Sequence, residues 1–384
     1  MTDKDATPSS THPPLPPTQE DERFAQLRLL RSRRVGISTY KRLLAEHGTA
    51  QNALAALPEV ARAAGVAEYR VCPAGVVAAE LKAAQRLGAK LLSIDAAEYP
   101  ETLAALSDAP PFLWTFGDAT MLQRPMISIV GARNASSLGT RMAKNMARDL
   151  GDAGFVVVSG LARGVDAAAH LASLATGTIA VQAGGVDIIY PAENTELSLN
   201  IAKAGLRVSE QPIGLQPMAR HFPSRNRLIA GLSQATIVIE AAAKSGSLIT
   251  ARDAADQGRD VLAVPGHPMD ARAAGCNMLI RDGAILVRSA KDVIELLGDP
   301  VAARMSPMLF EDQTSQGNDN LTIDTVSLRQ KILACLGPSP IAEDQLIRDL
   351  RASAAKVAPT LIDLELEGQI ARRPGGLLTK AVGG

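Results

Sequence analysis

Residues 126–137 read MISIVGARNASS, and this stretch decides the fold that we expect. The apolar run 126–130 predicts a buried strand, and residues 138–150 follow it with a helical pattern. Between them lie Gly131, where the backbone can approach a ligand closely, and Ser136 or Ser137, either of which can cap the helix. An apolar strand that leads through a polar turn into a helix is the repeating unit of a parallel α/β sheet.

Similar units recur along the chain as far as residue 298. The further short apolar segments that we predict to be strands are residues 156–158, 178–181, 207–208, 236–239, 261–264 and 284–287. Helical patterns such as residues 165–174 separate most of them. Because apolar strands that alternate with helices form parallel sheets covered on both faces, we predict an extended Rossmann-like, doubly wound, mostly parallel sheet. Such sheets bind their ligands beyond the carboxyl ends of the strands.

The N-terminal part of the chain has a different pattern. Residues 1–20 are rich in Pro, Ser and Thr, which predicts a disordered tail. Residues 21–88 are helical in pattern, with helices expected at 23–33 and 38–46 and with Ser38 as the N-cap of the second. The tight turn before Ser38 makes this layout similar to a SAM or helix-hairpin-helix domain, although the pattern favours a plain helical bundle with a capped second helix.

We expect the sheet domain to occupy residues 89–298 and to begin with a connecting segment that ends near Gly117. Residues 299–321 have no periodicity, which predicts a linker. In residues 322–384 the pattern predicts three helices and a Gly-tipped hairpin, at 326–336, 341–350, 354–367 and 370–378. That is the layout of a winged-helix domain, and its acidic third helix favours a protein contact over binding in a DNA groove.

The composition excludes several classes of protein. A formal net charge of +0 excludes a protein coated in positive charge, but it is compatible with a local basic groove. We expect no membrane contact, because no apolar run approaches the ~20 residues of a membrane span and the N-terminus lacks a signal-peptide core. The three cysteines, Cys72, Cys276 and Cys335, form no CxxC pair, which indicates a reducing compartment and a cytoplasmic protein.

Residues 222–233 read FPSRNRLIAGLS and predict an anion site. Arg225 and Arg227 stand directly before an apolar helical run, whose N-terminus offers unpaired N–H groups and a positive dipole end. Arginines at such a helix end bind phosphate. Phe222 offers a stacking face for a base, in a chain with only 3% aromatic residues. Asn226 contacts the ligand or braces the loop.

Polar turns with glycines follow most of the predicted strands. The turn SGLARGVD at residues 159–166 lies beside a helix start, and Asp166 and His170 of that helix share one face, which favours a structural capping pair over acid–base chemistry. Lys244 and Ser245 precede another helix. Because such turns meet at one edge of the sheet, they predict a single polar cleft. The GxGxxG and Walker patterns are absent from the sequence, so we expect no nucleotide cofactor.

Six motifs follow one another along the chain: SIVGAR at 128–133, SGLARGVDAAAH at 159–170, GGVDIIYPAEN at 184–194, FPSRNRLIAGLS at 222–233, SGSLITARDAADQGRDVLAVPG at 245–266 and GCNMLIRDGA at 275–284. Together they resemble the DNA processing protein A family (DprA, also called Smf), densely over residues 95–290. The resemblance implies a Rossmann-like domain that binds single-stranded DNA and loads RecA recombinase onto it in natural transformation, without catalysis or cofactor. It also implies a homodimer formed through the sheet domain.

The resemblance implies DNA contacts for particular residues. Gly131 and Arg133 would hold a backbone phosphate, and Phe222 would lie against a base. Arg225 and Arg227 would line the same pocket.

One position departs from the family pattern. Members often have a lysine shortly before the phenylalanine, and here Arg220 or Lys244 would supply that charge. The full set of residues that we expect to bind DNA is Gly131, Arg133, Ser159, Gly160, Arg163, Gly164, Arg220, Phe222, Arg225, Asn226, Arg227, Lys244 and Ser245.

The runner-up hypothesis is a Rossmann-like nucleotide-processing hydrolase of the nucleoside-monophosphate glycosidase type. Glu240 and Asp187 would then be the candidate acids. The PGGxGTxxE run expected of those enzymes is not in the sequence, which disfavours this hypothesis. A third hypothesis, a structural scaffold that recruits partners through its C-terminal domain, does not explain why polar turns gather at one sheet edge.

Overall fold

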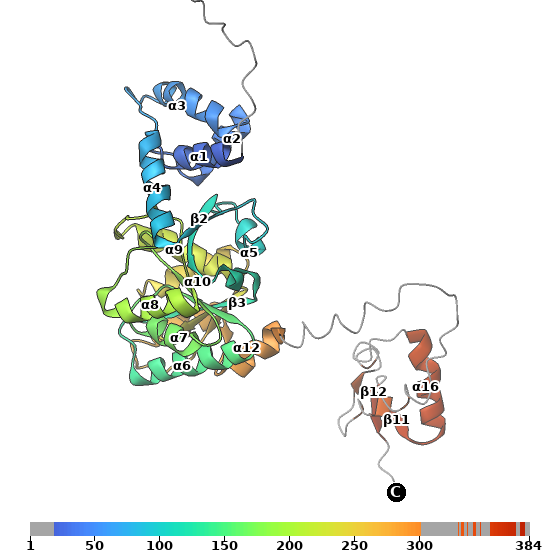
Figure 1. Cartoon of the computed structure of the whole chain (residues 1–384). Helices are drawn as coiled ribbons and strands as arrows, with labels where there is room; N and C mark the ends of the chain where they lie inside the picture. The colour runs from blue at the N-terminus through green and yellow to red at the C-terminus, as the bar shows by residue number, and fades with distance from the viewer. Residues whose placement is uncertain are drawn as a thin grey trace, which may run out of the picture. The chain divides into compact units, whose positions relative to one another are not determined.

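The computed structural model describes residues 19–300 and, nearer the C-terminus, residues 329, 332–333, 336, 341–342, 346, 354–373 and 377–380. It divides into two compact units, Met1–Leu309 and Phe310–Gly384, which are described separately below (Figure 1). The predicted tail and linker lie outside the described residues, apart from 19–20 and 299–300. Within the described ranges, no helix is long and apolar enough to span a membrane.

A nine-stranded sheet forms the centre of the first unit, in the order β1-β2-β6-β5-β4-β3-β7-β8-β9. Its strands are β1 (Lys90–Ser93), β2 (Phe112–Gly117), β3 (Met126–Gly131), β4 (Val156–Ser159), β5 (Thr178–Val181), β6 (Leu206–Ser209), β7 (Ala235–Ile239), β8 (Asp260–Ala263) and β9 (Ile285–Leu286). Every neighbouring pair from β6 to β9 is parallel, and the two remaining pairs, β1 with β2 and β2 with β6, are antiparallel. The expected doubly wound, mostly parallel sheet is therefore confirmed.

Helices cover both faces of this sheet (Figure 1). One face carries α6 (Ser137–Asp152), α7 (Val165–Ser173), α8 (Thr195–Ala204) and α12 (Ala290–Leu297), and the other carries α9 (His221–Leu232), α10 (Ser247–Asp256) and α11 (Ala274–Arg281). Ile127 and Ile129 pack under the first set, whereas Met126 and Val130 pack under the second. Successive side chains of a strand point to opposite faces, so the wholly apolar run in β3 requires two hydrophobic layers.

The chain order of the strands reverses between β3 and β7. From β3 the chain proceeds through β4, β5 and β6 on one side, and it then returns to build β7, β8 and β9 on the other. The loops that leave β3 and β7 therefore diverge and leave a crevice beyond the carboxyl ends of these two strands. Open α/β sheets bind ligands at such a switch point.

Residues 90–117 correct one expectation. We predicted a connecting segment, but these residues form β1 and β2, which add two antiparallel strands at the edge beside β6. The short helix α5 (Glu101–Ala104) separates them, and the 3-10 turns η1 (Ala119–Gln123) and η2 (Ala192–Asn194) occur later in the unit. Prolines at 100, 110 and 111 interrupt the apolar pattern there, because proline cannot continue a strand.

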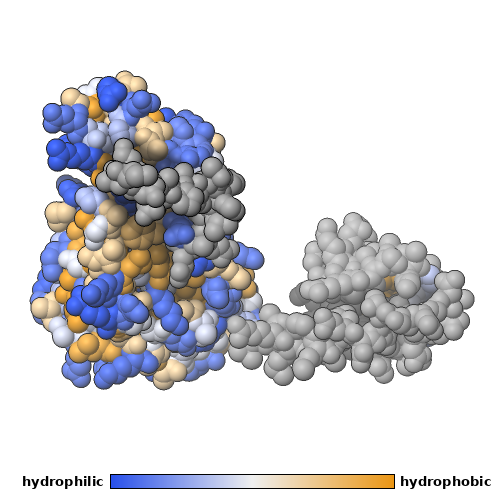
Figure 2. Space-filling view, turned by 45° about the horizontal axis from the view of Figure 1, so that its top comes forward, coloured by the Kyte–Doolittle hydropathy of each residue, from blue (hydrophilic) through white to orange (hydrophobic). Residues whose placement is uncertain are grey.

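The N-terminal helices are α1 (Gln19–Leu30), α2 (Ile37–His47), α3 (Ala50–Ala63) and α4 (Ala74–Leu87). The N-cap of α2 is Gly36, without a side-chain bond, so the expected cap at Ser38 was wrong. Buried Glu80 of α4 pairs with Arg31 at 2.8 Å and accepts a 2.8 Å hydrogen bond from Trp114 Nε1 of β2. This network fixes the helices to the edge of the sheet. Figure 2 shows hydrophobic residues gathered over the middle of one face of this unit.

The second unit contains the strands β10 (Ile341–Ala342), β11 (Ile370–Arg373) and β12 (Leu377–Lys380) and the helix α16 (Ala354–Leu366). The strands form an antiparallel sheet in the order β10-β12-β11, and Leu361, Leu364 and Leu378 pack in its core. The predicted third helix and hairpin are confirmed, as is a winged-helix domain. Residues 341–342 form a strand rather than the expected helix start, and most of the predicted helix 326–336 lies outside the described residues.

Candidate nucleic-acid interface

A groove with a volume of about 780 Å³ opens at the switch point between β3 and β7. Its walls are the turn 131–134 after β3, the first turns of α9 and the loop 242–247 after β7. The predicted polar cleft is therefore present at the carboxyl edge of the sheet. Seven of the thirteen expected residues line it: Gly131, Arg133, Phe222, Arg225, Asn226, Lys244 and Ser245.

Cations dominate the lining of this groove. Arg133, Lys244 and Arg272 are exposed at its rim, and Arg225 lies buried at its floor. Among the described residues that line the groove, Asp166 is the only acid, and it is buried. An excess of positive charge within one concave site attracts anionic ligands even though the formal net charge of the chain is +0.

Phe222 stands half-buried at this groove, beside Arg133. The Arg133 guanidinium carbon lies 5.6 Å from the centre of the Phe222 ring, which is within the range of a cation–π contact. A cationic side chain and an aromatic face are thus adjacent. This pairing suits a ligand that carries both a phosphate and a base.

The helix α9 begins at His221, so the FPSRNR sequence lies within the helix rather than before it. Pro223 is tolerated because it falls in the first helical turn. Side chains two positions apart on a helix differ by about 200° in direction, so Arg225 and Arg227 cannot face one pocket. The expectation that both line the same pocket was therefore wrong.

Arg227 makes structural contacts on the other side of α9. Its Nη1 donates to the Asp108 carbonyl at 2.8 Å, and its guanidinium pairs with the carboxylates of Glu210 and Asp108. The guanidinium is largely buried, as is the Glu210 carboxylate. A buried arginine paired with carboxylates has little free charge to offer to DNA.

Arg225 supports the groove from below. Its Nη1 donates to the Val181 carbonyl at 2.9 Å, and a Cβ on Gly160 would lie 1.7 Å from the same atom. Gly160 is therefore required so that the guanidinium can lie over the turn after β4. Burial lowers the pKa of Arg225 to about 10, so the side chain stays charged at neutral pH.

Asp166 and His170 hold the same turn. Asp166 Oδ2 accepts hydrogen bonds from the backbone N–H groups of Gly160 (3.1 Å) and Ala162 (3.3 Å). His170 Nε2 accepts from Leu161 N–H at 3.3 Å, and its Nδ1 lies 2.7 Å from Thr178 Oγ1. Burial lowers the pKa of His170 to about 3, so its imidazole is neutral. The contacts support the structural interpretation of this pair.

Other residues from the turn after β4 lie away from the groove. Ser159 is buried and donates to the Ile129 carbonyl at 2.6 Å. Gly164 is needed because a Cβ there would lie 2.2 Å from the Ala132 carbonyl oxygen. Arg163 is exposed and forms a 3.5 Å ion pair with Glu193. Ser159 and Gly164 therefore fix the backbone around this turn, and Arg163 lies on the surface.

Glu240 directly follows β7 and anchors the turn that carries Arg133. Its Oε2 accepts from Ser136 N–H at 2.8 Å, its Oε1 is hydrogen-bonded to Ser136 Oγ, and Ser136 Oγ accepts from Gly139 N–H at 2.9 Å. The carboxylate therefore occupies the positive N-terminus of α6, at the end of the turn that carries Arg133. Glu240 has a left-handed backbone (φ 50°), which is strained for a residue with a side chain.

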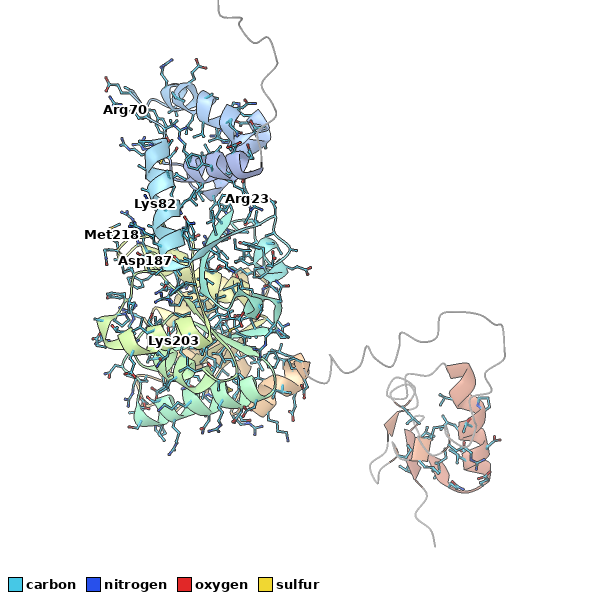
Figure 3. The ribbon with its side chains drawn as sticks, in the orientation of Figure 1. Arg23, Arg70, Lys82, Asp187, Lys203 and Met218 are labelled. Carbon is cyan, nitrogen blue, oxygen red and sulfur yellow. The ribbon has the colours of Figure 1, made fainter. Side chains whose placement is uncertain are left out.

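The two candidate acids of the hydrolase hypothesis are separated from the groove. Asp187, labelled in Figure 3, accepts from Gly214 N–H at 2.9 Å, and neither Asp187 nor Glu240 lines the groove. Both carboxylates instead fix loop backbones. Within the described ranges, no three His, Cys, Asp or Glu side chains are placed to hold a metal ion.

The remaining predicted residues lie at the rim or beside it. Asn226 Nδ2 lies 3.5 Å from the Gly246 carbonyl, and Ser245 Oγ lies 2.7 Å from Ser247 Oγ. Arg220 is exposed at the start of α9 and does not line the groove. The lining residues with polar side chains that were not among the predicted DNA contacts are Asn134, Asp166, Ser247, Thr250 and Arg272. The position of Arg272 in the loop after β8, at the same sheet edge, could have revealed it.

Three sequence families match consecutive parts of the chain. Residues 90–298 match the family described as DNA recombination-mediator protein A. Residues 20–83 match a DprA-like N-terminal HHH domain, and residues 319–376 match a DprA winged helix domain.

Individual proteins are similar over long stretches. A protein named Smf from Synechocystis is 35% identical over 318 residues, which cover 76% of this chain and 80% of the relative. A DNA processing protein DprA from Bacillus subtilis is 43% identical over 220 residues, covering 56% of this chain and 74% of the relative.

Two solved structures are also similar. DNA processing protein A from Streptococcus pneumoniae has a TM-score of 0.61 at 33% identity and covers 71% of this chain and 97% of its own. DNA processing protein A from Helicobacter pylori, solved to study its single-stranded DNA binding mode, has a TM-score of 0.51 at 31% identity, covering 54% and 95%.

Proposed function

This chain belongs to the DNA recombination-mediator protein A (DprA/Smf) family, and from this premise we propose that it binds single-stranded DNA in the groove at the ends of β3 and β7. The observation that carries the proposal is that Arg133, Phe222 and Lys244 line one groove of about 780 Å³. The similar Helicobacter pylori protein, studied for its single-stranded DNA binding, supports the choice of ligand.

Each part of the groove has a role in this proposal. Arg133 and Lys244 bind backbone phosphates, because both are exposed cations on opposing loops. Phe222 stacks on a base, which requires that the base be unpaired, so the groove selects single strands. Arg225 holds the floor in place from beneath. No step needs catalysis or a cofactor.

Arg272 adds a phosphate contact that the sequence did not predict. It is exposed, lines the groove and forms a 3.2 Å ion pair with Asp270, which neutralises part of its charge. Arg220, at the exposed start of α9, guides the strand towards the groove.

We also propose that the bound strand is passed to RecA recombinase in natural transformation, and that this takes place in the cytoplasm. The description of the matching family as a recombination mediator supports the first part. The free, buried thiols of Cys72 and Cys276 support a reducing compartment.

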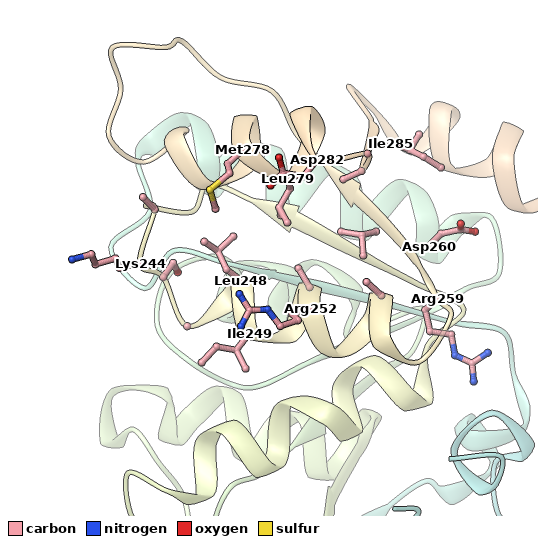
Figure 4. A pocket seen from close by; sticks show the side chains of 18 residues that line it. Lys244, Leu248, Ile249, Arg252, Arg259, Asp260, Met278, Leu279, Asp282 and Ile285 are labelled. Atoms are coloured by element: carbon pink, nitrogen blue, oxygen red, sulfur yellow. The ribbon is translucent and has the colours of Figure 1, made fainter. Parts of the chain in front are cut away.

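A homodimer forms through the outer edge of the sheet in this proposal. The edge strand β9 exposes Ile285 and Leu286, with 38% and 45% of their surfaces accessible. Beside it lies a second cavity of about 750 Å³, and Figure 4 shows Leu248 and Leu279 at this cavity, between α10 and α11. An apolar edge strand invites pairing with another copy. Ile285→Asp should convert the dimer into a monomer in analytical ultracentrifugation, whereas a wild-type monomer would contradict the dimer.

The main experiment titrates the full-length protein with a labelled oligo-dT and with a duplex of equal length, in parallel with an assay for nucleotide hydrolysis. We expect tight binding of the single strand, weaker binding of the duplex and no hydrolysis. Equal affinity for both DNA forms would contradict base stacking at Phe222. Hydrolysis of a nucleotide would favour the enzyme hypothesis.

A further inference from the structure

Tyr190 is an exposed aromatic side chain in a chain with few aromatics. Half of its surface is accessible (50%), and every other aromatic residue in the described part of the chain is buried or half-buried. It lies in the loop after β5, and the centre of its ring is 5.6 Å from that of Phe222. Single exposed apolar residues are common on protein surfaces. Tyr190 differs because it contacts an aromatic residue of the groove.

Arg133, Phe222 and Tyr190 form a continuous row. Arg133 lies over the Phe222 ring, and Tyr190 contacts the same ring from its own loop. Beyond Phe222 a small cavity of about 10 Å³ continues the groove and is lined by Phe222, Tyr190, Arg225 and Gln182. The concave surface therefore extends past Phe222 to the tyrosine.

Gln182 provides a polar group at this small cavity. Its Nε2 donates to the Ile188 carbonyl at 2.9 Å, which fixes the orientation of the amide. Gln182 is only 6% exposed, and its Oε1 atom is buried. This oxygen has no hydrogen-bond partner among the described residues. Buried acceptors are normally satisfied, so this oxygen needs a donor at the small cavity, which a water or a group on a ligand can supply.

We propose that Tyr190 is a second base-stacking residue, which holds the nucleotide next to the one on Phe222. The proposal rests on the proposed function. The two rings are tilted by 53°, so one flat base cannot stack on both. Bases that stack on the two rings are tilted relative to each other by the same angle, so two adjacent bases must unstack from each other to reach both rings.

The cavity has room for one small group rather than for a base. A base on Tyr190 therefore remains on the surface and directs a single edge donor, such as an exocyclic amino group, towards Gln182 Oε1. Tyr190 supplies stacking area, and its contribution does not depend on charge.

The test measures the affinity of the full-length protein for labelled single-stranded DNA over a series of salt concentrations. Tyr190→Ala should weaken binding by about 5- to 150-fold without changing the salt slope, because no phosphate contact is lost. Tyr190→Phe should bind as the wild type does. Leu171→Ala is the matched control, since Leu171 is also about half exposed (53%) and lies on α7, away from the groove.

A photocrosslink provides an independent readout. Oligonucleotides that carry 5-iododeoxyuridine should form adducts with Tyr190 as well as with Phe222. This readout decides the matter if Tyr190→Ala lowers the melting temperature.

The outcomes separate the two proposals. If Tyr190→Ala binds DNA as tightly as the wild type, or if only Phe222 forms a crosslink, the second stacking site is overturned. Weaker binding by Arg133→Ala would in that case still show that the groove binds DNA. Failure of the wild-type protein to bind single-stranded DNA overturns the proposed function and, with it, the role of Tyr190.

Discussion

Replacing Gly160 with alanine should displace the buried guanidinium of Arg225. The new Cβ would lie 1.7 Å from Arg225 Nη1 and 2.5 Å from Cζ, and the guanidinium belongs to a side chain that is only 6% exposed. An ordinary contact needs roughly 3.5 Å, so the group must move by more than about 1.5 Å. Such a shift breaks the 2.9 Å hydrogen bond to the Val181 carbonyl.

The cost follows from the charge of the displaced group. A hydrogen bond to a charged group contributes about 1.5–3 kcal/mol. Moving a buried charge out of its site costs about 3–5 kcal/mol when no new partner compensates. Partial relaxation of the loop recovers some of this lost free energy. We therefore expect Gly160→Ala to lower the free energy of unfolding by about 3 kcal/mol. For a domain of this size the melting temperature then falls by about 6–12 °C.

Thermal unfolding followed by far-UV circular dichroism measures the effect. The matched control is Gly75→Ala, since Gly75 lies in α4 and nothing lies within 4 Å of the position that a Cβ would occupy there. That variant should be neutral or slightly more stable, because alanine favours a helix. If Gly160→Ala melted within about 1 °C of the wild type, far less than 1 kcal/mol would be lost and the placement of Arg225 would be refuted.

Three further predictions concern the groove and the turns that build it. Phe222→Ala should weaken single-stranded DNA binding by about 1–3 kcal/mol with an unchanged salt slope, as measured by fluorescence anisotropy. The pKa of His170 lies near 3 in the folded protein, below that of the unfolded chain, so its contribution to stability is complete above about pH 6.5 and is lost as the pH falls towards 3. In urea unfolding, the free energy of unfolding of the wild type should therefore fall by up to about 1.4 kcal/mol per pH unit in that window. The fall should be less steep in His170→Gln. If both proteins lost stability with pH at the same rate, the neutral imidazole would be contradicted. Glu240→Ala should weaken DNA binding through Arg133, so the double variant with Arg133→Ala should bind no more weakly than Arg133→Ala alone.

The parallel strands of the central sheet could be predicted from the sequence, because each of them is a short apolar run between helices. Residues 126–130 and 156–158 are apolar at nearly every position, since strands covered on both faces have no polar side. The antiparallel strands β1 and β2 were missed because prolines between them resemble a loop. Their pairing with β6 depends on contacts that are distant in sequence, which no local pattern reports.

The site was only partly predictable for a related reason. Sequence motifs identified which turns meet at the sheet edge, but not which way each side chain points. Arg225 and Arg227 carry the same charge, yet one is fixed by Val181 and the other by Glu210 and Asp108. That difference follows from the start of α9 at His221, one residue before the predicted stretch begins. The sequence also does not show why a glycine is needed at a given turn. Gly160 makes room for the guanidinium of Arg225 rather than for a ligand.

The salt dependence of single-stranded DNA binding tests the central claim most directly. The affinity of wild-type protein and of Arg133→Ala for an oligo-dT should be measured from low to moderate salt. Each phosphate contact contributes a slope of about −0.7 in log affinity against log salt, so the wild type should show a steep fall and Arg133→Ala a weaker affinity with a slope reduced by about 0.7. Binding that does not depend on salt, or an Arg133→Ala variant with the wild-type slope, would contradict phosphate recognition in this groove.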